Sequence, residues 1–255
     1  MRILLTLLSF FTFLNVTASE IYAVGSRDYT FTDTARNRKI TAHVWHPVNA
    51  NTAVAPVNPK GPFRPAVAAL DSPVAKSKKP FPVVLMSHGS MGLANRLFWL
   101  ADKLIKNGIV VIAVDHPGNM FGDSSADGLM RVWDRSKDLT FVLNAIENVP
   151  DFRNRLDLTK ISAIGHSAGG TAVLLLAGAR FSFDQFNTPI PNCAGSKDPF
   201  YKKQCDELAK LNSKSFGKEV IEGDYSDSRI KSILVLDPGF VRSFRKESLT
   251  KIKNR

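Results

Sequence analysis

Two short apolar runs constrain the fold of this chain more than any other feature. Residues 82–86 (Pro-Val-Val-Leu-Met) and 109–114 (Ile-Val-Val-Ile-Ala-Val) show no alternation between apolar and polar side chains. Such runs are typical of strands that are buried on both faces, as in a parallel sheet. A chain of 255 residues is long enough for one large domain of this kind and too short for two of them.

Helical periodicity lies between and after these runs. A helix is expected over residues 96–106, with Asn107-Gly108 as its C-terminal stop, and a second over residues 131–148, with Pro150 beyond its end. Later elements follow the same order: a strand at 160–164, a helix at 167–177 and a strand at 230–236. This alternation predicts a doubly wound α/β fold with a mostly parallel sheet.

Two segments depart from the alternation. Residues 38–45 alternate enough to form an early antiparallel strand that His46-Pro47 closes, and the proline-containing residues 47–80 predict an exposed connection. The insertion at about 180–228 is much longer than a usual α/β loop. It is interpreted either as a lid over the carboxyl edge of the sheet or as a surface insertion without a role in substrate choice.

The N-terminus has the order of an export signal. Arg2 precedes an apolar stretch from Ile3 to about Val16, and small residues follow, so cleavage is expected after Ala18. The apolar run is short for a bilayer span, so the mature domain, residues 19–255, is expected to be secreted or periplasmic without an integral membrane segment. In that setting Cys193 and Cys205 are expected to form a disulfide.

The positive charge does not point to nucleic acid. The net charge is +11, and removal of residues 1–18 takes away Arg2 and no acidic residue, leaving +10. Lysines and arginines are scattered in pairs such as Lys78-Lys79, without interleaved aromatic residues, which favours a solvated basic surface. No nucleic-acid partner and no metal or other cofactor is expected, and the oligomeric state stays open.

The motif Gly165-His166-Ser167-Ala168-Gly169 lies between a predicted strand and a predicted helix. A G-x-S-x-G segment in this position is typical of a nucleophile elbow, in which the glycines allow a tight, strained turn that exposes the serine. Ser167 is therefore the candidate nucleophile of an acyl-transfer site.

Such a site also needs oxyanion donors and an acid. The backbone N–H of Ala168 would supply one donor, and the glycine-rich loop after residue 86 would supply another from Ser90. A flexible strand-to-helix loop is the competing interpretation. Asp237, which ends the strand 230–236, is the candidate acid because the acid follows the serine in this fold. A turn aspartate is the alternative there.

These residues carry a resemblance to a known family. His88-Gly89, residues 115–118, the motif around Ser167 and Leu236-Asp237, together with Val44-Trp45-His46-Pro47, resemble the platelet-activating-factor acetylhydrolase and predicted dienelactone hydrolase-like branch of the α/β-hydrolases. The similarity runs from about residue 28 to 242. It implies metal-free hydrolysis of small or short-acyl esters by Ser167, Asp237 and the donors Ser90 and Ala168. Serine in place of the cysteine of plain dienelactone hydrolases favours carboxylic esters.

The chain departs from that family in its histidines. All five, His43, His46, His88, His116 and His166, precede Asp237, whereas the family's base follows the acid. Without a base the serine hydroxyl is a poor nucleophile. We therefore expect an impaired esterase, with His116 as the one substitute base to test, and a non-catalytic protein that binds an acyl ligand or a partner as the alternative.

The C-terminal residues are expected to be incomplete for such a fold. Residues 241–255 are basic and polar, and residues 249–253 resemble the beginning of a missing strand. A sheet without its further strands would have an unpaired apolar edge, which predicts a poorly stable or aggregation-prone product.

Overall fold

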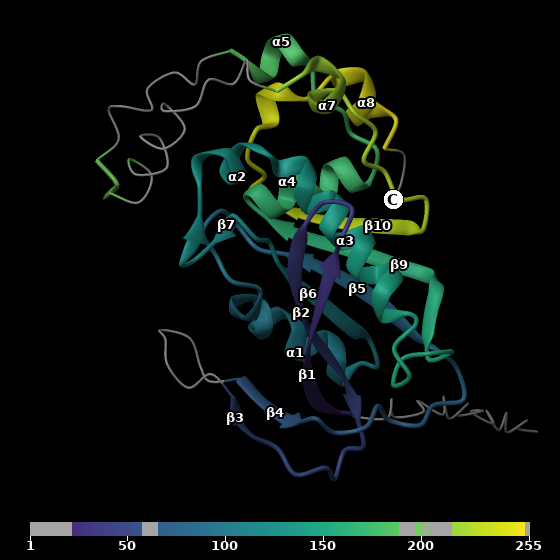
Figure 1. Ribbon diagram of the computed structural model, residues 1–255. Coiled ribbons are helices and arrows are strands. Elements are labelled where there is room, and N and C mark those ends of the chain that lie inside the picture. The colour runs from purple at the N-terminus through teal and green to yellow at the C-terminus, as the bar shows by residue number, and fades with distance from the viewer. Residues whose placement is uncertain (1–21, 58–65, 189–196, 200–201, 203–215, 253–255) are drawn as a thin grey trace, which may run out of the picture.

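The computed structural model describes residues 22–57, 66–188, 197–199, 202 and 216–252 (Figure 1). The strands of its main sheet are β1 (Ala23–Asp33), β2 (Arg38–Val48), β3 (Ala55–Val57), β4 (Ala66–Leu70), β5 (Phe81–Ser87), β6 (Val110–Asp115), β9 (Leu156–His166) and β10 (Ile230–Leu236). Their spatial order is β10-β9-β5-β6-β2-β1-β4-β3. A separate hairpin consists of β7 (Asn119–Met120) and β8 (Asp123–Ser124).

The helices connect the strands as the alternation predicts. They are η1 (Ala94–Leu97), α1 (Phe98–Lys106), α2 (Ala126–Met130), α3 (Val132–Ile146), α4 (Ala168–Leu176), α5 (Phe183–Phe186), α7 (Lys218–Ile221), η4 (Val241–Ser243) and α8 (Lys246–Thr250). The helix predicted from residue 96 starts as the 3-10 turn η1, and the other predicted α/β helices differ by one or two residues at their ends.

The centre of the sheet is parallel and buried on both faces. β5 pairs in parallel with β6 and β9, and β9 pairs in parallel with β10. Successive β5 residues enter different cores: Val83 and Leu85 pack in the cluster that contains α3 and α4 residues, whereas Val84 and Met86 pack in the cluster that contains α1 residues. This two-sided burial confirms the doubly wound arrangement and explains the absence of alternation in residues 82–86.

The strand at residues 38–45 is antiparallel, as expected, but His46-Pro47 does not close it. β2 continues to Val48 because β1 pairs with it along the whole length, from Asp33 opposite Arg38 to Ala23 opposite Val48. The His46 side chain is buried inside this ladder rather than in a turn.

The prediction of an exposed connection over residues 47–80 was wrong in part, since many of its described residues are exposed but the segment also contains strands and buried residues. This segment contains β3 and β4, which pair with each other, and β4 also pairs in parallel with β1 at Gly25 and Ser26. Val74 and Ala75 are buried in the main core. Pairing with distant residues, not local periodicity, makes these short segments strands.

The described flanks of the insertion are packed together. Residues of α5 and α7 form an apolar cluster with α2, α3, α4 and the segment around Phe244, and Figure 1 shows α5, α7 and α8 gathered at one end of the molecule. The middle of the insertion, including Cys193 and Cys205, lies largely outside the described residues, and so does the predicted signal at residues 1–18. The predicted disulfide and signal therefore stay predictions.

The expectation that a strand begins at residue 249 was wrong for the described residues. Leu249 belongs to α8, and Leu249 and Ile252 pack against the same apolar cluster, while Ser248 Oγ accepts from the N–H of Arg180. The spacing of these contacts suits a helical turn and not a strand. In the described part of the chain, no helix combines the length and the apolar character that a membrane crossing requires.

Candidate functional site

Ser167 occupies the sharp turn between β9 and α4. Its backbone has φ of 52° and ψ of −120°, which is strained for a residue with a side chain. The strain is held in place because the Ser167 N–H donates to Leu236 O at 2.9 Å and the Gly239 N–H donates to Ser167 O at 3.2 Å. The half-buried Ser167 Oγ makes no hydrogen bond with any described residue.

The two glycines of the motif are required by close backbone contacts. A Cβ atom at Gly165 would lie 2.1 Å from Gly169 O, and one at Gly169 would lie 2.1 Å from Ser87 O. The turn is therefore pressed against the end of β5, and only glycine fits at either position. This geometry agrees with the nucleophile elbow that the sequence predicted.

The loop after β5, residues 88–92, lies against this turn, and we name it the oxyanion loop. A Cβ atom at Gly89 would be 3.3 Å from Ser167 Cβ and 3.0 Å from His166 Nδ1. Among the described residues, the backbone N–H groups of Ser90 and Ala168 have no hydrogen-bond acceptor. The loop and the turn thus present two free donors, the number that an oxyanion hole needs.

Asp237 directly follows the strand beside β9. Its side chain is exposed and its backbone is left-handed, with φ of 43°. The turn that it begins is attached to the elbow, because Thr171 Oγ1 donates to Gly239 O at 2.6 Å. Asp237 is therefore held on the same sheet edge as Ser167, and no described histidine is hydrogen-bonded to it.

The structure does not support His116 as a substitute base. Its Nε2 lies 2.9 Å from Ser87 Oγ and its Nδ1 lies 3.0 Å from Asp138 Oδ2, so both ring nitrogens are occupied. Burial, followed by the charge of Arg135, lowers the pKa of His116 to about 4. His116 is thus a neutral, fully buried side chain that is bonded away from Ser167.

Three other histidines also have defined surroundings. Burial, with the nearby Arg135 charge, lowers the pKa of His88, whose Nδ1 donates to Gly89 O at 2.7 Å. Burial lowers the pKa of His46 to about 4. His166, beside Ser167, is exposed.

His43, on β2, lies between two carboxylates. Its Nδ1 lies 2.8 Å from Asp28 Oδ1 and its Nε2 lies 2.9 Å from Asp115 Oδ2. Burial alone would lower the pKa of His43, but the hydrogen bonds to Asp115 and Asp28 outweigh it and raise the pKa to about 9. The ring is therefore a cation between two carboxylates at neutral pH.

Two cavities open on the described surface. One of about 510 Å³ is lined by residues of β1, β2, β3 and β4 and includes His43, and one of about 430 Å³ is lined by residues 37–39, the segment 116–119 and the start of α3. Neither lining includes Ser167.

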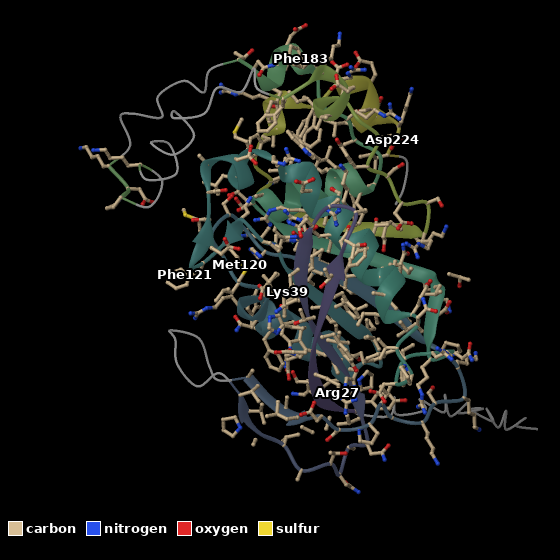
Figure 2. The ribbon with its side chains drawn as sticks, in the orientation of Figure 1. Arg27, Lys39, Met120, Phe121, Phe183 and Asp224 are labelled. Atoms are coloured by element: carbon tan, nitrogen blue, oxygen red, sulfur yellow. The ribbon has the colours of Figure 1, made fainter. Side chains whose placement is uncertain are left out.

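A short hairpin adds an apolar element beside the oxyanion loop. β7 is attached there because the Phe121 N–H donates to Gly92 O at 3.0 Å and Met120 forms a bridge with Gly92. Figure 2 shows Met120 and Phe121 at the outer side of the molecule, and Phe121 is 72% exposed. The sequence analysis missed this hairpin, because two-residue strands carry no periodicity.

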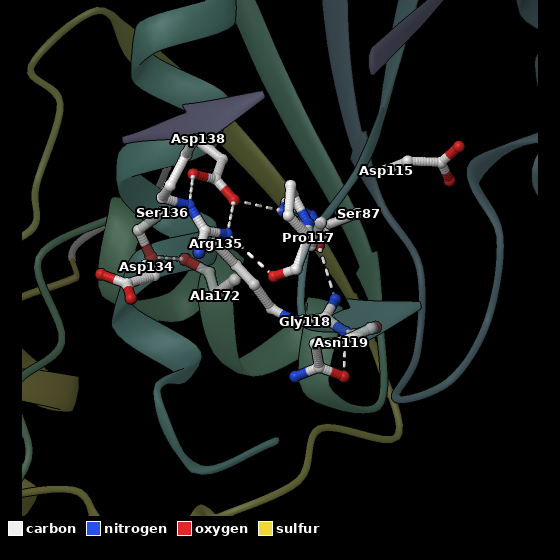
Figure 3. Close-up of polar contacts among 12 residues, drawn as sticks. Ser87, Asp115, Pro117, Gly118, Asn119, Asp134, Arg135, Ser136, Asp138 and Ala172 are labelled. Atoms are coloured by element: carbon white, nitrogen blue, oxygen red, sulfur yellow. Dashed lines mark hydrogen bonds and ion pairs between the residues drawn. The ribbon is translucent and has the colours of Figure 1, made fainter. Parts of the chain in front are cut away.

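The sequence analysis also missed a buried polar network. Asp138 accepts from Arg36 and Arg38 as well as contacting His116, and Arg135 lies beside it on the same helix. Figure 3 shows Arg135 and Asp138 among these contacts. Charged residues on the inward side of an otherwise apolar helix are the sequence signal that could have found them.

Several known proteins are similar to part of the chain. Cutinase est1 and cutinase est2 of Thermobifida alba are 28% and 33% identical over 99 and 98 residues, which is 38% of this chain. The aligned segment spans 30% of the length of each cutinase. A solved ferulic acid esterase from Streptomyces cinnamoneus aligns with a TM-score of 0.46 and 21% identity, over 62% of this chain and 55% of that one.

The model of the Hydrolase_4 family, described as serine aminopeptidase, S33, matches residues 78–252. This range includes β5, the oxyanion loop, the turn at Ser167 and the turn at Asp237. Since the match covers more than half of the chain and the sheet has the expected mostly parallel order, the chain belongs to the Hydrolase_4 family and has an α/β-hydrolase fold.

Proposed function

We propose that the chain derives from a serine esterase that cleaves small or short-acyl carboxylic esters through an acyl-enzyme at Ser167. The observation that carries the proposal is the strained backbone of Ser167, which places an unbonded Oγ at a strand-to-helix turn. The similarity to two cutinases supports ester substrates. The resemblance to the acetylhydrolase and dienelactone hydrolase-like branch is a finer assignment within this proposal.

In the proposed reaction, Ser167 Oγ attacks the ester carbonyl and the carbonyl oxygen becomes an anion. The N–H groups of Ser90 and Ala168 would donate to that oxygen, since both are free in the described structure. The proton of Ser167 Oγ passes to a base and from there to the departing alkoxide, so the alcohol leaves neutral. Water then hydrolyses the ester bond to Ser167 and releases the acid. Asp237 is the proposed acid of the triad, where it would orient a histidine base.

The lack of a base that is hydrogen-bonded to Ser167 limits the rate in this proposal. His116 is bonded to Ser87 and Asp138, and His166 is exposed but has no bond to Ser167 Oγ. A serine without a base attacks slowly, because no group takes its proton. We therefore propose impaired turnover for residues 1–255 by themselves.

The lack of a base bonded to Ser167 also favours one alternative function. A protein that keeps the elbow and the oxyanion donors without a bonded base could bind an acyl ligand without cleaving it. Binding of a short-chain fatty acid by the Ser167→Ala variant, measured by calorimetry, together with an absence of hydrolysis by the parent chain, would favour this alternative.

The test of the main proposal is hydrolysis of a short-chain p-nitrophenyl ester. The chain is compared with Ser167→Ala, in buffer and in the presence of imidazole as an external base. We expect low activity that imidazole raises only when Ser167 is present. Equal rates in the parent chain and in Ser167→Ala, with and without imidazole, would reject Ser167 as the nucleophile.

Export is a separate part of the proposal. A signal at residues 1–18 with cleavage after Ala18 would place the mature protein outside the cytoplasm, where Cys193 and Cys205 would form a disulfide. N-terminal sequencing of the protein from the culture medium or periplasm tests this: a first residue other than Ser19 contradicts the cleavage site.

A further inference from the structure

Arg135 on α3 is the most deeply buried arginine of the described residues, with 1% of its surface exposed. Burial lowers its pKa to about 9, while the nearby Asp138 carboxylate favours the charged form, so the guanidinium remains charged at neutral pH. The protein therefore retains a buried charge despite its desolvation cost, and the groups that the guanidinium contacts show what it stabilises.

The Arg135 guanidinium donates hydrogen bonds to the oxyanion loop. Its Nη1 donates to His88 O, and its Nη2 donates to Gly89 O at 3.4 Å. Its Nη2 also donates to Asn119 Oδ1 at 2.9 Å and to Asn119 O at 3.2 Å (Figure 3). One guanidinium thus binds two consecutive carbonyls of the loop and the first residue of the hairpin.

The direction of these carbonyls fixes the direction of the neighbouring amides. In a planar trans peptide, the N–H points opposite to the C=O of the same unit. The carbonyl of Gly89 also accepts from His88 Nδ1 at 2.7 Å and from the Gly92 N–H at 3.0 Å. It belongs to the same peptide as the N–H of Ser90, so Arg135 and these two donors together turn the Ser90 N–H to the opposite side. This is the amide that the proposed function uses as an oxyanion donor.

The loop needs such support because its backbone is strained. Met91 has φ of 54°, a conformation that costs a residue with a side chain on the order of 1–3 kcal/mol. The hairpin supports the loop from the other side through the bond from the Phe121 N–H to Gly92 O. Arg135, which binds Asn119 as well as the loop, joins both supports.

We propose that Arg135 is a positioning residue that holds the oxyanion loop so that the Ser90 N–H faces Ser167. Its charge also polarises the two peptides whose carbonyls it binds, which makes their N–H groups better donors. This proposal rests on the proposed function of Ser167. Lysine would not replace the arginine, because a single ammonium group lacks the planar fork that reaches His88, Gly89 and Asn119 together.

Hydrogen exchange of the oxyanion loop tests the proposal without requiring turnover. In Arg135→Lys we expect exchange in residues 88–92 to become about tenfold faster than in the parent chain, while α4 and β9 keep their protection. The control is Arg131→Lys, at the N-terminal cap of α3, where the arginine pairs with Asp134 and has no hydrogen bond to the loop. Unchanged exchange in the loop would overturn the proposal.

Kinetics supply the second readout. They are measured either with or without imidazole, in the condition under which the Ser167-dependent hydrolysis is measurable. Per active site titrated with a fluorophosphonate, Arg135→Lys is expected to lower kcat by about 10²-fold and to change KM by less than about threefold. A purely structural role would lower the melting temperature and the number of titratable sites but leave kcat per site unchanged, which would overturn the proposal.

A second variant covers the case in which Arg135→Lys does not fold. Asn119→Ala removes one acceptor of the guanidinium and keeps the charge, so a smaller change in the same direction is expected in loop exchange and kcat. No change in either measurement would count against Arg135. Hydrolysis that persists in Ser167→Ala would reject the proposed function, whereas the exchange measurement would still decide the role of Arg135.

Discussion

Nδ1 of His116 lies 3.0 Å from Oδ2 of Asp138, and neither side chain is exposed to solvent. Since Nε2 of the same ring contacts Ser87 Oγ, the three residues have the connectivity of a hydrolytic triad. The cluster is nevertheless closed to substrate, because Ser87 is also fully buried. It joins the ends of β5 and β6 to α3, directly beneath the oxyanion loop.

Asp138 is expected to be critical for stability. Its carboxylate pairs with Arg36 and Arg38, so Asp138→Leu would leave the Arg38 guanidinium without its carboxylate and Arg36 with Asp33 as its one remaining carboxylate. We expect a loss of about 3–5 kcal/mol in the free energy of unfolding, measured by chemical denaturation. The control Asp102→Asn breaks only the helix-surface pair with Lys106 and should cost less than about 1 kcal/mol. Equal losses in the two variants would contradict this prediction.

His43 is expected to make stability fall at alkaline pH. Its pKa is raised to about 9 in the folded protein, above the unfolded value of 6.5, so the stabilisation is complete below pH 6.5 and is lost as the pH rises through 9. The loss should be on the order of 2 kcal/mol and should be absent in His43→Gln. Denaturation midpoints between pH 6 and pH 10 measure it. The same alkaline slope in His43→Gln would assign the effect to another group.

Gly169 is expected to tolerate no side chain. A Cβ atom there would collide with the backbone at Ser87 O, so Gly169→Ala must displace either α4 or the end of β5. We expect a destabilisation above about 3 kcal/mol or no folded protein, measured by circular dichroism. Gly122→Ala is the matched control, because nothing lies within 4 Å of its Cβ position and only its left-handed backbone, about 1 kcal/mol, opposes the change. A stable Gly169→Ala protein would contradict the close contact between residue 169 and Ser87 O.

The edge strand β10 is expected to promote self-association. It is hydrogen-bonded to β9 on one side and is the last strand of the described sheet, and its Leu234 side chain is 45% exposed. Leu234→Lys places a charge on this edge and should shift the protein towards the monomer in sedimentation velocity experiments. Val241→Lys, an exposed position outside the strand, should change little. A parent chain that is monomeric throughout the concentration range would contradict the prediction.

Local sequence determined the central elements of this fold. Residues 230–236 form β10 with the predicted bounds because they are a short, mostly apolar run. Residues 131–148 form α3 with shorter ends because their apolar side chains repeat with the helical period. The strand-to-helix turn at Ser167 followed from its glycines, which a tight turn requires. The α/β-hydrolase superfamily could also be anticipated from these motifs, whereas the family model that matches is Hydrolase_4 and not the branch that the sequence resembles.

Other features depended on residues that are distant in the sequence. β3 and β4 are strands because they pair with each other and with β1, and residues 249–252 are helical at their start because Leu249 and Ile252 pack on a cluster formed by the insertion flanks. The contacts of Arg135 with His88 and Gly89 join residues that are 47 and 46 positions apart, so no local periodicity predicts them.

The sequence by itself therefore determined which residues form the parallel sheet and where the candidate nucleophile lies, because periodicity and turn chemistry are local properties of the chain. Only the tertiary structure decided how the histidines are used. A histidine becomes a base, a buried neutral group or a cation according to its burial and its neighbours, and in His116 and His43 those neighbours come from other elements.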